Sequence, residues 1–372
     1  MKFLTYFIVI PGSKETLTNT PIKLLIAASG TGGHLFPAIA TAKELKDYQI
    51  EWLGVPNRLE TKLVPSQYPL HTISVEGFQQ KLGLGTLKIL SGLIGSILKV
   101  RHILKQGNFQ GLFTTGGYIA APAIIAARSL GLPVILHESN VLPGKVTRWF
   151  SSLCNVVALG FEEGAKYLPN GKTVYVGTPV REQFLSPQVL DIPIPENVPV
   201  IAVVGGSQGA VSVNQLVREC VPAWVDAGAW IIHQTGENDR DAFSVEHPQY
   251  FPMTFYNNMA GLFQRANLVI GRAGAGTLTE LAVTHTPSIL IPYPYAADNH
   301  QVYNANVFAN QEAAIVFPQS ELTSEKLETV VLELLNSPEK LEKMNQGSEK
   351  LAVNDSAKRL ANLVDKLLND YS

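Results

Sequence analysis

A histidine directly after a run of glycines is the residue of this chain best suited to move a proton. Residues 29–34 are Ser-Gly-Thr-Gly-Gly-His, so His34 ends a turn that its glycines make conformationally permissive. A helix that starts here offers N–H groups and a partial positive charge to a phosphate. Because a neutral imidazole could accept a proton from a sugar hydroxyl, we predict that His34 is a catalytic base. The alternative is a structural turn with a hydrogen-bonding histidine.

This turn matches neither of the two common nucleotide motifs. The dinucleotide fingerprint needs a third glycine where the chain has Leu35. A P-loop ending at Gly171-Lys172-Thr173 would need a glycine in place of Lys166. A nicotinamide dehydrogenase is therefore not favoured.

A second glycine-rich stretch, residues 271–280, could also cradle an anion. It reads Gly-Arg-Ala-Gly-Ala-Gly-Thr-Leu-Thr-Glu and follows an apolar run, so a diphosphate could rest on the helix start. Glu280 would then lie one turn into the helix and could accept hydrogen bonds from ribose hydroxyls. The alternative is an ordinary helix start with an acidic residue in its first turns.

The third candidate is His137-Glu138-Ser139-Asn140, at the predicted end of another strand. A carboxylate buried there would be costly without a partner or a function. We predict that Glu138 is either an alternative base or the group that orients His34, and the competing interpretation is a satisfied structural turn.

These candidates follow short apolar runs that alternate with helical patterns. Runs that predict strands of a parallel sheet lie at residues 22–28, 50–54, 111–115, 134–137, 200–204, 230–234, 268–271 and 288–291. Helical patterns lie at 35–47, 121–130 and 210–219. Strand, glycine-rich turn and helix thus occur twice, which predicts an α/β fold with two doubly wound, Rossmann-like domains facing a cleft.

The length of 372 residues also suits two domains. From composition we expect a first domain at 21–181, a proline-rich linker at 182–199, a second domain at 200–355, and a C-terminal helix at 356–372 that packs back on the first domain. Residues 1–20 are expected to be a dispensable or poorly ordered extension, and the alternative is a targeting signal. Two distant cysteines, Cys154 and Cys220, fit a reducing compartment.

Charge is distributed unevenly between the halves. Residues 1–181 hold 18 Lys and Arg against 9 Asp and Glu, whereas residues 182–372 hold 11 against 22. The segment 77–107 combines Leu87, Leu90, Ile94, Ile97 and Leu98 at near-helical spacing with basic residues only, namely Lys81, Lys88, Lys99, Arg101 and Lys105. We expect it to lie on an anionic membrane surface, extended by Lys145, Arg148, Trp149 and Phe150. The alternative is a core-facing helix with a solvated basic face. We expect no nucleic-acid partner.

Taken together, the motifs resemble those of the MurG family of glycosyltransferases. The matching stretches run in the family's order from Ile22 onward, and they are residues 30–34 with Pro37, 52–54, 116–118, 137–140, 178–181, 205–210, Asn214, 255–259, 272–280 and 298–305. The resemblance implies the two-domain fold called GT-B. It also implies inverting transfer of N-acetylglucosamine from UDP-N-acetylglucosamine to lipid I, a polyprenyl-diphosphate-linked muramyl peptide, on the cytoplasmic face of the plasma membrane.

The resemblance also implies which residues hold the donor. The substrate-binding positions that it carries over are Thr31, Gly32, Gly33, Asn140, Arg181, Ser207, Tyr256, Ala275, Gly276, Thr277, Leu278, Thr279, Glu280 and Gln301. Of these, Ser207 and Arg181 would contact the diphosphate, and the backbone at Tyr256 would bind the uracil. The chain departs from the commonest family pattern at Ser29, Thr178, Ser139 and His300.

No cofactor or metal is expected. The one D-x-D string, Asp239-Arg240-Asp241, lies in a polar stretch and is interpreted as a chance match. Two other functions remain open from sequence alone: a related transferase with another lipid acceptor, such as diacylglycerol, and a non-catalytic nucleotide-sugar-binding membrane partner.

Overall fold

The computed structural model describes residues 21–75, 85–206 and 208–371, with side chains from Ser91 onward in the helix that begins at Gly85. The predictions for residues 1–20, for Ser207, and for the side chains of Lys81, Leu87, Lys88 and Leu90 lie outside the described residues.

The first domain is built on a parallel sheet. Its strands in spatial order are β3 (Leu70–Thr72), β2 (Tyr48–Gly54), β1 (Ile22–Ala27), β4 (Gly111–Thr114), β5 (Val134–Glu138), β6 (Val156–Leu159) and β7 (Thr173–Tyr175). The strand order reverses between β1 and β4, so the segments that follow these two strands diverge at a topological switch point, where ligands bind in such sheets.

The second domain repeats this plan. Its parallel strands in spatial order are β10 (Tyr250–Met253), β9 (Trp230–Gln234), β8 (Val200–Val204), β11 (Leu268–Gly271), β12 (Ser288–Leu290) and β13 (Ala314–Val316). Its switch point lies between β8 and β11. The turns after these strands are the glycine-rich stretches 205–210 and 271–280, so the duplication predicted from sequence is confirmed.

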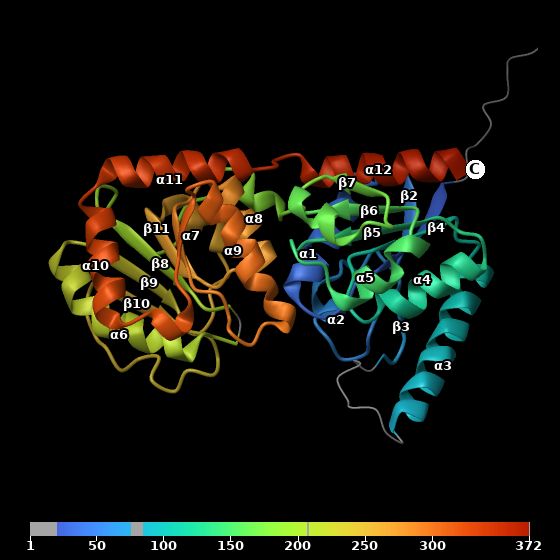
Figure 1. Ribbon diagram of the computed structural model, residues 1–372, viewed down its shortest axis with the longest axis horizontal. Coiled ribbons are helices and arrows are strands. Elements are labelled where there is room, and N and C mark those ends of the chain that lie inside the picture. Colours follow the sequence, from blue (N-terminus) through green and yellow to red (C-terminus); the bar gives the residue numbers. More distant parts are fainter. Residues whose placement is uncertain (1–20, 76–84, 207, 372) are drawn as a thin grey trace, which may run out of the picture.

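Helices cover both faces of each sheet (Figure 1). In the first domain they are α1 (Gly32–Glu44), α2 (Glu60–Leu63), α3 (Gly85–Gln106), α4 (Ala120–Ser129) and α5 (Lys145–Phe150). In the second they are α6 (Val211–Asp226), α7 (Met259–Arg265), α8 (Ala275–Val283), α9 (His300–Asn310), α10 (Ser324–Leu335) and α11 (Pro338–Leu351). Fully apolar strands such as β8 need this cover, because both faces of a parallel sheet are buried.

The last helix returns to the first domain. Helix α12 (Ser356–Tyr371) buries Leu360, Val364 and Leu368 in the same core cluster as Leu35 of α1, and Figure 1 shows it lying along that domain. The Pro-rich segment 182–199 packs on the second domain, where Arg265 donates hydrogen bonds of 2.9 Å to the carbonyls of Pro195, Glu196 and Val198. This segment is therefore held in place rather than loose.

Candidate functional site

His34 lies at the switch point of the first sheet. It is the third residue of α1, directly after β1, and Thr115 follows the neighbouring strand β4. The Nδ1–H of His34 donates to the carbonyl oxygen of Thr115 over 2.7 Å. This bond sets the neutral tautomer whose Nε2 can accept a proton. Thr115 was not predicted from sequence, because only the strand order makes it a neighbour of His34.

The N-terminal ends of α1 and α8 meet across the boundary between the domains. A Cβ on Gly276, in the first turn of α8, would lie 3.9 Å from the Cα of Gly33 in the first turn of α1. A Cβ on Gly32 would lie 2.7 Å from the ring of Phe36, so any larger residue there would force that ring to shift. Two helix ends with unpaired amides thus converge beside His34, and their combined partial charges favour an anion there.

Within 275–280, the structure separates residues that can reach a ligand from residues that cannot. Ala275, Gly276 and Thr277 form the first turn of α8, where N–H groups have no acceptor inside the helix. The Leu278 side chain is fully buried and its N–H donates to Gly274, and the buried Thr279 donates its hydroxyl to the Ala275 carbonyl. The side chains of Leu278 and Thr279 thus pack in the core, and their predicted contacts with the donor stay predictions.

Arg181 and Glu280 form an ion pair between the domains. The Arg181 guanidinium donates to Glu280 Oε1 over 2.9 Å and stacks on the rings of Phe36 and Phe184. Burial raises the pKa of Glu280, and the neighbouring guanidinium opposes that rise. The Arg181 Nε is buried without a hydrogen-bond partner. These two residues, which are predicted to bind different parts of the donor, contact each other.

The Glu138 carboxylate is engaged by four hydrogen bonds from the protein. Its Oε1 accepts from the N–H and the amide of Asn140 at 3.0 and 3.1 Å, and its Oε2 accepts from the Gly144 N–H at 3.0 Å and the Thr147 hydroxyl at 2.7 Å. A carboxylate offers about four acceptor positions, so all are occupied. The carboxylate holds residues 140–147 in their turn, and the donors of its four hydrogen bonds are Asn140, Gly144 and Thr147, not His34.

Asn304 on α9 links the two domains and was missed as an individual residue. Its Oδ1 accepts from the Val141 N–H at 3.0 Å, and its Nδ2 donates to Asn140 Oδ1 at 3.1 Å and to the Ala273 carbonyl at 3.2 Å. The only sequence signal was its position inside the family-like stretch 298–305. In the same stretch, Asp298 pairs with Arg148 of the first domain, so Arg148 contributes to this boundary.

The remaining predicted donor contacts lie on the second domain. Tyr256 is buried and its hydroxyl donates to Asp191, so its side chain is occupied. The predicted contact with the uracil ring would therefore come from its backbone. Gln301 Oε1 accepts from the Tyr293 N–H over 2.8 Å, which orients its amide. Thr31 is exposed at the start of α1, and its carbonyl accepts from the His34 N–H over 3.1 Å.

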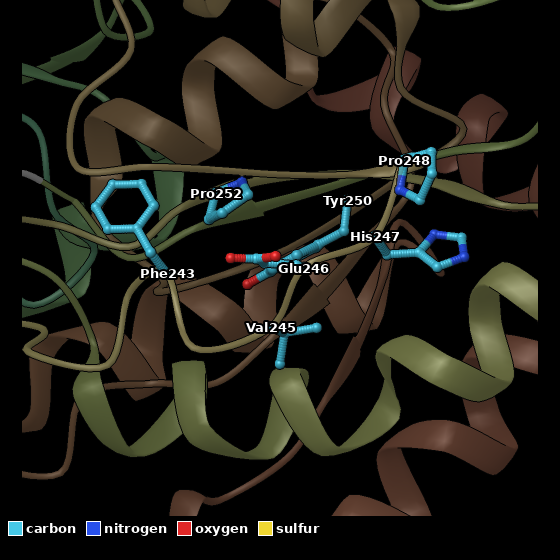
Figure 2. Close-up of a pocket in the computed structure, with 7 residues that line it drawn as sticks. All are labelled: Phe243, Val245, Glu246, His247, Pro248, Tyr250 and Pro252. Atoms are coloured by element: carbon cyan, nitrogen blue, oxygen red, sulfur yellow. The ribbon is translucent and has the colours of Figure 1, made fainter.

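Two other features lie apart from this site. A hollow of about 500 Å³ is lined by Phe243, Val245, Glu246, His247, Pro248, Tyr250 and Pro252, at the outer edge of the second sheet. Figure 2 shows Phe243 and Pro252 on one side of it and His247 and Pro248 on the other, and none of the predicted site residues lines it. Over the described residues, no group of three or more His, Cys, Asp and Glu side chains is arranged to hold a metal ion.

Helix α3 has both a core-facing and an exposed apolar side. Val100 and Leu104 are buried in the first domain's core, whereas Ile94 and Leu98 are 52% and 61% exposed. Trp149 on α5 is also 61% exposed. None of the helices in residues 21–75, 85–206 and 208–371 combines the length and hydropathy that a bilayer-spanning segment needs.

Comparison with known proteins agrees with this architecture. Residues 24–159 match the glycosyltransferase family 28 N-terminal domain, and residues 200–360 match the glycosyltransferase family 28 C-terminal domain. A Trichodesmium erythraeum protein named UDP-N-acetylglucosamine--N-acetylmuramyl-(pentapeptide) pyrophosphoryl-undecaprenol N-acetylglucosamine transferase is 80% identical over 355 residues, which cover 95% of each chain. A Synechocystis protein of the same name is 60% identical over 92% of this chain and 97% of its own length.

Solved structures give the same picture. The crystal structure of MurG from Acinetobacter baumannii superposes with a TM-score of 0.76 at 29% identity, covering 93% of this chain and 100% of that one. The calicheamicin glycosyltransferase CalG4 superposes with a TM-score of 0.70 at 13% identity over 94% of this chain and 98% of its own, which shows a shared fold alone.

Proposed function

Since the chain belongs to the MurG family within glycosyltransferase family 28, we propose how its two domains carry out that family's reaction. The enzyme transfers N-acetylglucosamine from UDP-N-acetylglucosamine to lipid I and forms lipid II for peptidoglycan synthesis. One observation supports our assignment of the site. The N-termini of α1 and α8 converge at Gly33 and Gly276, and Gly33 directly precedes His34.

His34 is the base in this proposal. The 4-hydroxyl of the acceptor's N-acetylmuramate attacks the anomeric carbon of the donor from the face opposite UDP, which inverts that carbon. The hydroxyl proton passes to His34 Nε2, because the carbonyl of Thr115 keeps the proton of this imidazole on Nδ1. Glu138 is left with the role of supporting the turn, since its oxygens are already fully hydrogen-bonded.

The departing UDP is stabilised by fixed dipoles and a cation. The first amides of α8, at Ala275 to Thr277, point at the diphosphate, and amides that are already oriented need no reorganisation as charge develops. Arg181 adds positive charge beside them. Glu280 keeps its Oε2 for the ribose hydroxyls while Oε1 accepts from Arg181.

The other contacts complete donor recognition. Ser207 and its turn hold the diphosphate, the backbone at Tyr256 binds uracil, and the Gln301 amide binds sugar hydroxyls. Thr31, Gly32 and Gly33 close the site from the first domain, and Asn140 acts mainly by joining Glu138 to Asn304.

We also propose that the reaction needs no metal ion, which a direct test can check. Because helix amides and Arg181 supply the positive charge, turnover is expected to be unchanged after dialysis against EDTA. Activity that disappears with EDTA and returns with Mg²⁺ or Mn²⁺ would contradict the proposal.

The acceptor's lipid requires a membrane surface, and we assign α3 to it, on the cytoplasmic face of the plasma membrane. Ile94 and Leu98 lie one helical turn apart and exposed, beside exposed Lys99 and Lys105. In vesicle flotation, the protein should bind anionic vesicles at low salt, and the double variant Ile94→Ser, Leu98→Ser should bind much less. Equal flotation of both proteins would argue against this surface.

The decisive experiment follows transfer of labelled N-acetylglucosamine from its UDP donor to a short-chain lipid I analogue, with diacylglycerol as the competing acceptor. His34→Ala is expected to lose about 10²–10⁴-fold in kcat while it binds UDP normally. Wild-type turnover in His34→Ala would exclude the base role, and transfer to diacylglycerol alone would exclude the acceptor.

A further inference from the structure

A cluster of buried polar side chains lies behind the Gly205–Ala210 turn of the second domain. Asn214 and Arg218 come from α6, His233 from β9, and Asp239 from the loop that follows β9. Each of the four is at most 9% exposed. Burying an aspartate and an arginine is costly unless both are paired and hydrogen-bonded.

Asp239 is the centre of this cluster. Its Oδ2 accepts from Arg218 and from Asn214, each over 2.7 Å, and its Oδ1 accepts from the Asp241 N–H over 3.1 Å. Burial acts to raise the pKa of Asp239, but the bonds from Arg218 and Asn214 outweigh it and hold that pKa below its usual range. Both carboxylate oxygens of Asp239 are therefore engaged by donors within the protein.

The cluster is completed from the sheet. The Nε2–H of His233 donates to Asn214 Oδ1 over 3.1 Å, and the Tyr250 hydroxyl donates to His233 Nδ1 over 2.8 Å. Burial lowers the pKa of His233 to about 3, so the ring is neutral and keeps these two roles. The orientation of the Asn214 amide is thus determined on both sides, which leaves its Nδ2 to donate to Asp239 and to the carbonyl of Thr235.

The loop that Asp239 anchors presses directly on the glycine-rich turn. A Cβ on Gly209 would lie 2.2 Å from the Thr235 carbonyl oxygen, and one on Gly236 would lie 2.2 Å from the Gly209 nitrogen. Both glycines have positive φ, 81° and 82°. In addition, Asn238 Nδ2 donates to the Gln208 carbonyl over 3.1 Å. The backbone at Gln208 and Gly209 therefore packs directly on the loop.

We propose that Asp239, held by Arg218 and Asn214, is a positioning residue that sets the backbone at Gln208 and Gly209 in the glycine-rich turn and so the affinity for the donor's diphosphate. The inference rests on the proposed role of this turn in binding the diphosphate. The exposed side chain of Asp241 should be dispensable, because only the backbone N–H of this residue bonds to Asp239.

The matched pair Asp239→Asn and Asp241→Asn tests this, because the same chemical change is made two residues apart. UDP affinity is measured by calorimetry, and initial rates are measured against donor and acceptor. We expect Asp239→Asn to raise the UDP dissociation constant and the donor KM about tenfold to a hundredfold, with kcat and acceptor KM within twofold. Asp241→Asn should match wild type. A purely structural defect would instead lower the active fraction, and thus kcat, at unchanged KM.

A milder variant keeps the test decisive if Asp239→Asn fails to fold. Asn238→Ala removes one bond from an exposed side chain to the turn and should raise the UDP dissociation constant severalfold. The inference is overturned if these variants bind UDP as wild type does, if kcat alone falls, or if both aspartate variants lose activity together and EDTA mimics them. Wild-type protein that does not bind UDP would instead refute the proposed function.

Discussion

Replacing Asn304 with alanine is expected to loosen the contact between the two domains. This fully buried side chain bonds to Asn140 and Val141 of the first domain and to Ala273 of the second. Alanine removes all three bonds. It also leaves the buried Val141 N–H and the Ala273 carbonyl without this partner as long as the domains stay together.

The size of the effect can be worked out from these groups. A hydrogen bond contributes about 1 kcal/mol net, and a buried polar group left unsatisfied costs about 1–3 kcal/mol. The unsatisfied Val141 N–H and Ala273 carbonyl, after some local relaxation, should together destabilise the closed arrangement of the domains by about 3 kcal/mol. At about 1.4 kcal/mol per factor of ten, the closed-to-open ratio falls roughly a hundredfold.

Hydrogen exchange at the Val141 amide measures this directly, because that N–H is protected by Asn304 itself. Exchange in Asn304→Ala should be roughly a hundredfold faster than in wild type, while the Leu136 amide inside β5 should be unchanged. Asn306→Ala, an exposed position on the same helix, is the control and should exchange as wild type does. Unchanged protection of Val141 in Asn304→Ala, or equal acceleration in the control, would refute the reasoning.

Three further predictions concern buried titratable side chains. Burial lowers the pKa of His137 to about 4 and of His233 to about 3, below the ordinary 6.5, so stability is complete above pH 6.5 and is lost as pH falls. Urea unfolding should show a loss of about 2 kcal/mol per domain between pH 7 and pH 5, and equal stability at both would contradict it. Glu138→Gln should destabilise the protein by about 2 kcal/mol yet keep kcat within tenfold in the folded state, whereas a loss beyond a thousandfold would restore Glu138 as base. Arg181→Gln and Glu280→Gln should each weaken UDP binding, and the double variant should lose about 1 kcal/mol less binding free energy than the sum of the two single losses. Strictly additive losses would show that the pair is not coupled.

Local sequence was sufficient for the framework of this protein. Apolar runs such as 200–204 predict buried parallel strands because both faces of such strands are covered. The glycine-rich turns were recognisable because close backbone approach, as at Gly209 and Gly236, excludes any side chain. Strand, turn and helix in the same order twice predicted the two-domain α/β fold.

The tertiary structure decided which polar groups meet. The sequence does not show that Arg181 pairs with Glu280, that Asn304 joins the domains, or that Thr115 orients His34, because each partner is brought there by the docking of sheets and helices. Burial has the same origin: Asp239 and Asp241 look alike in sequence, yet only the first lies under α6 with two donors. Hydrophobic pattern and turn chemistry are local properties, whereas the partners of a buried charge depend on contacts between residues far apart in the chain.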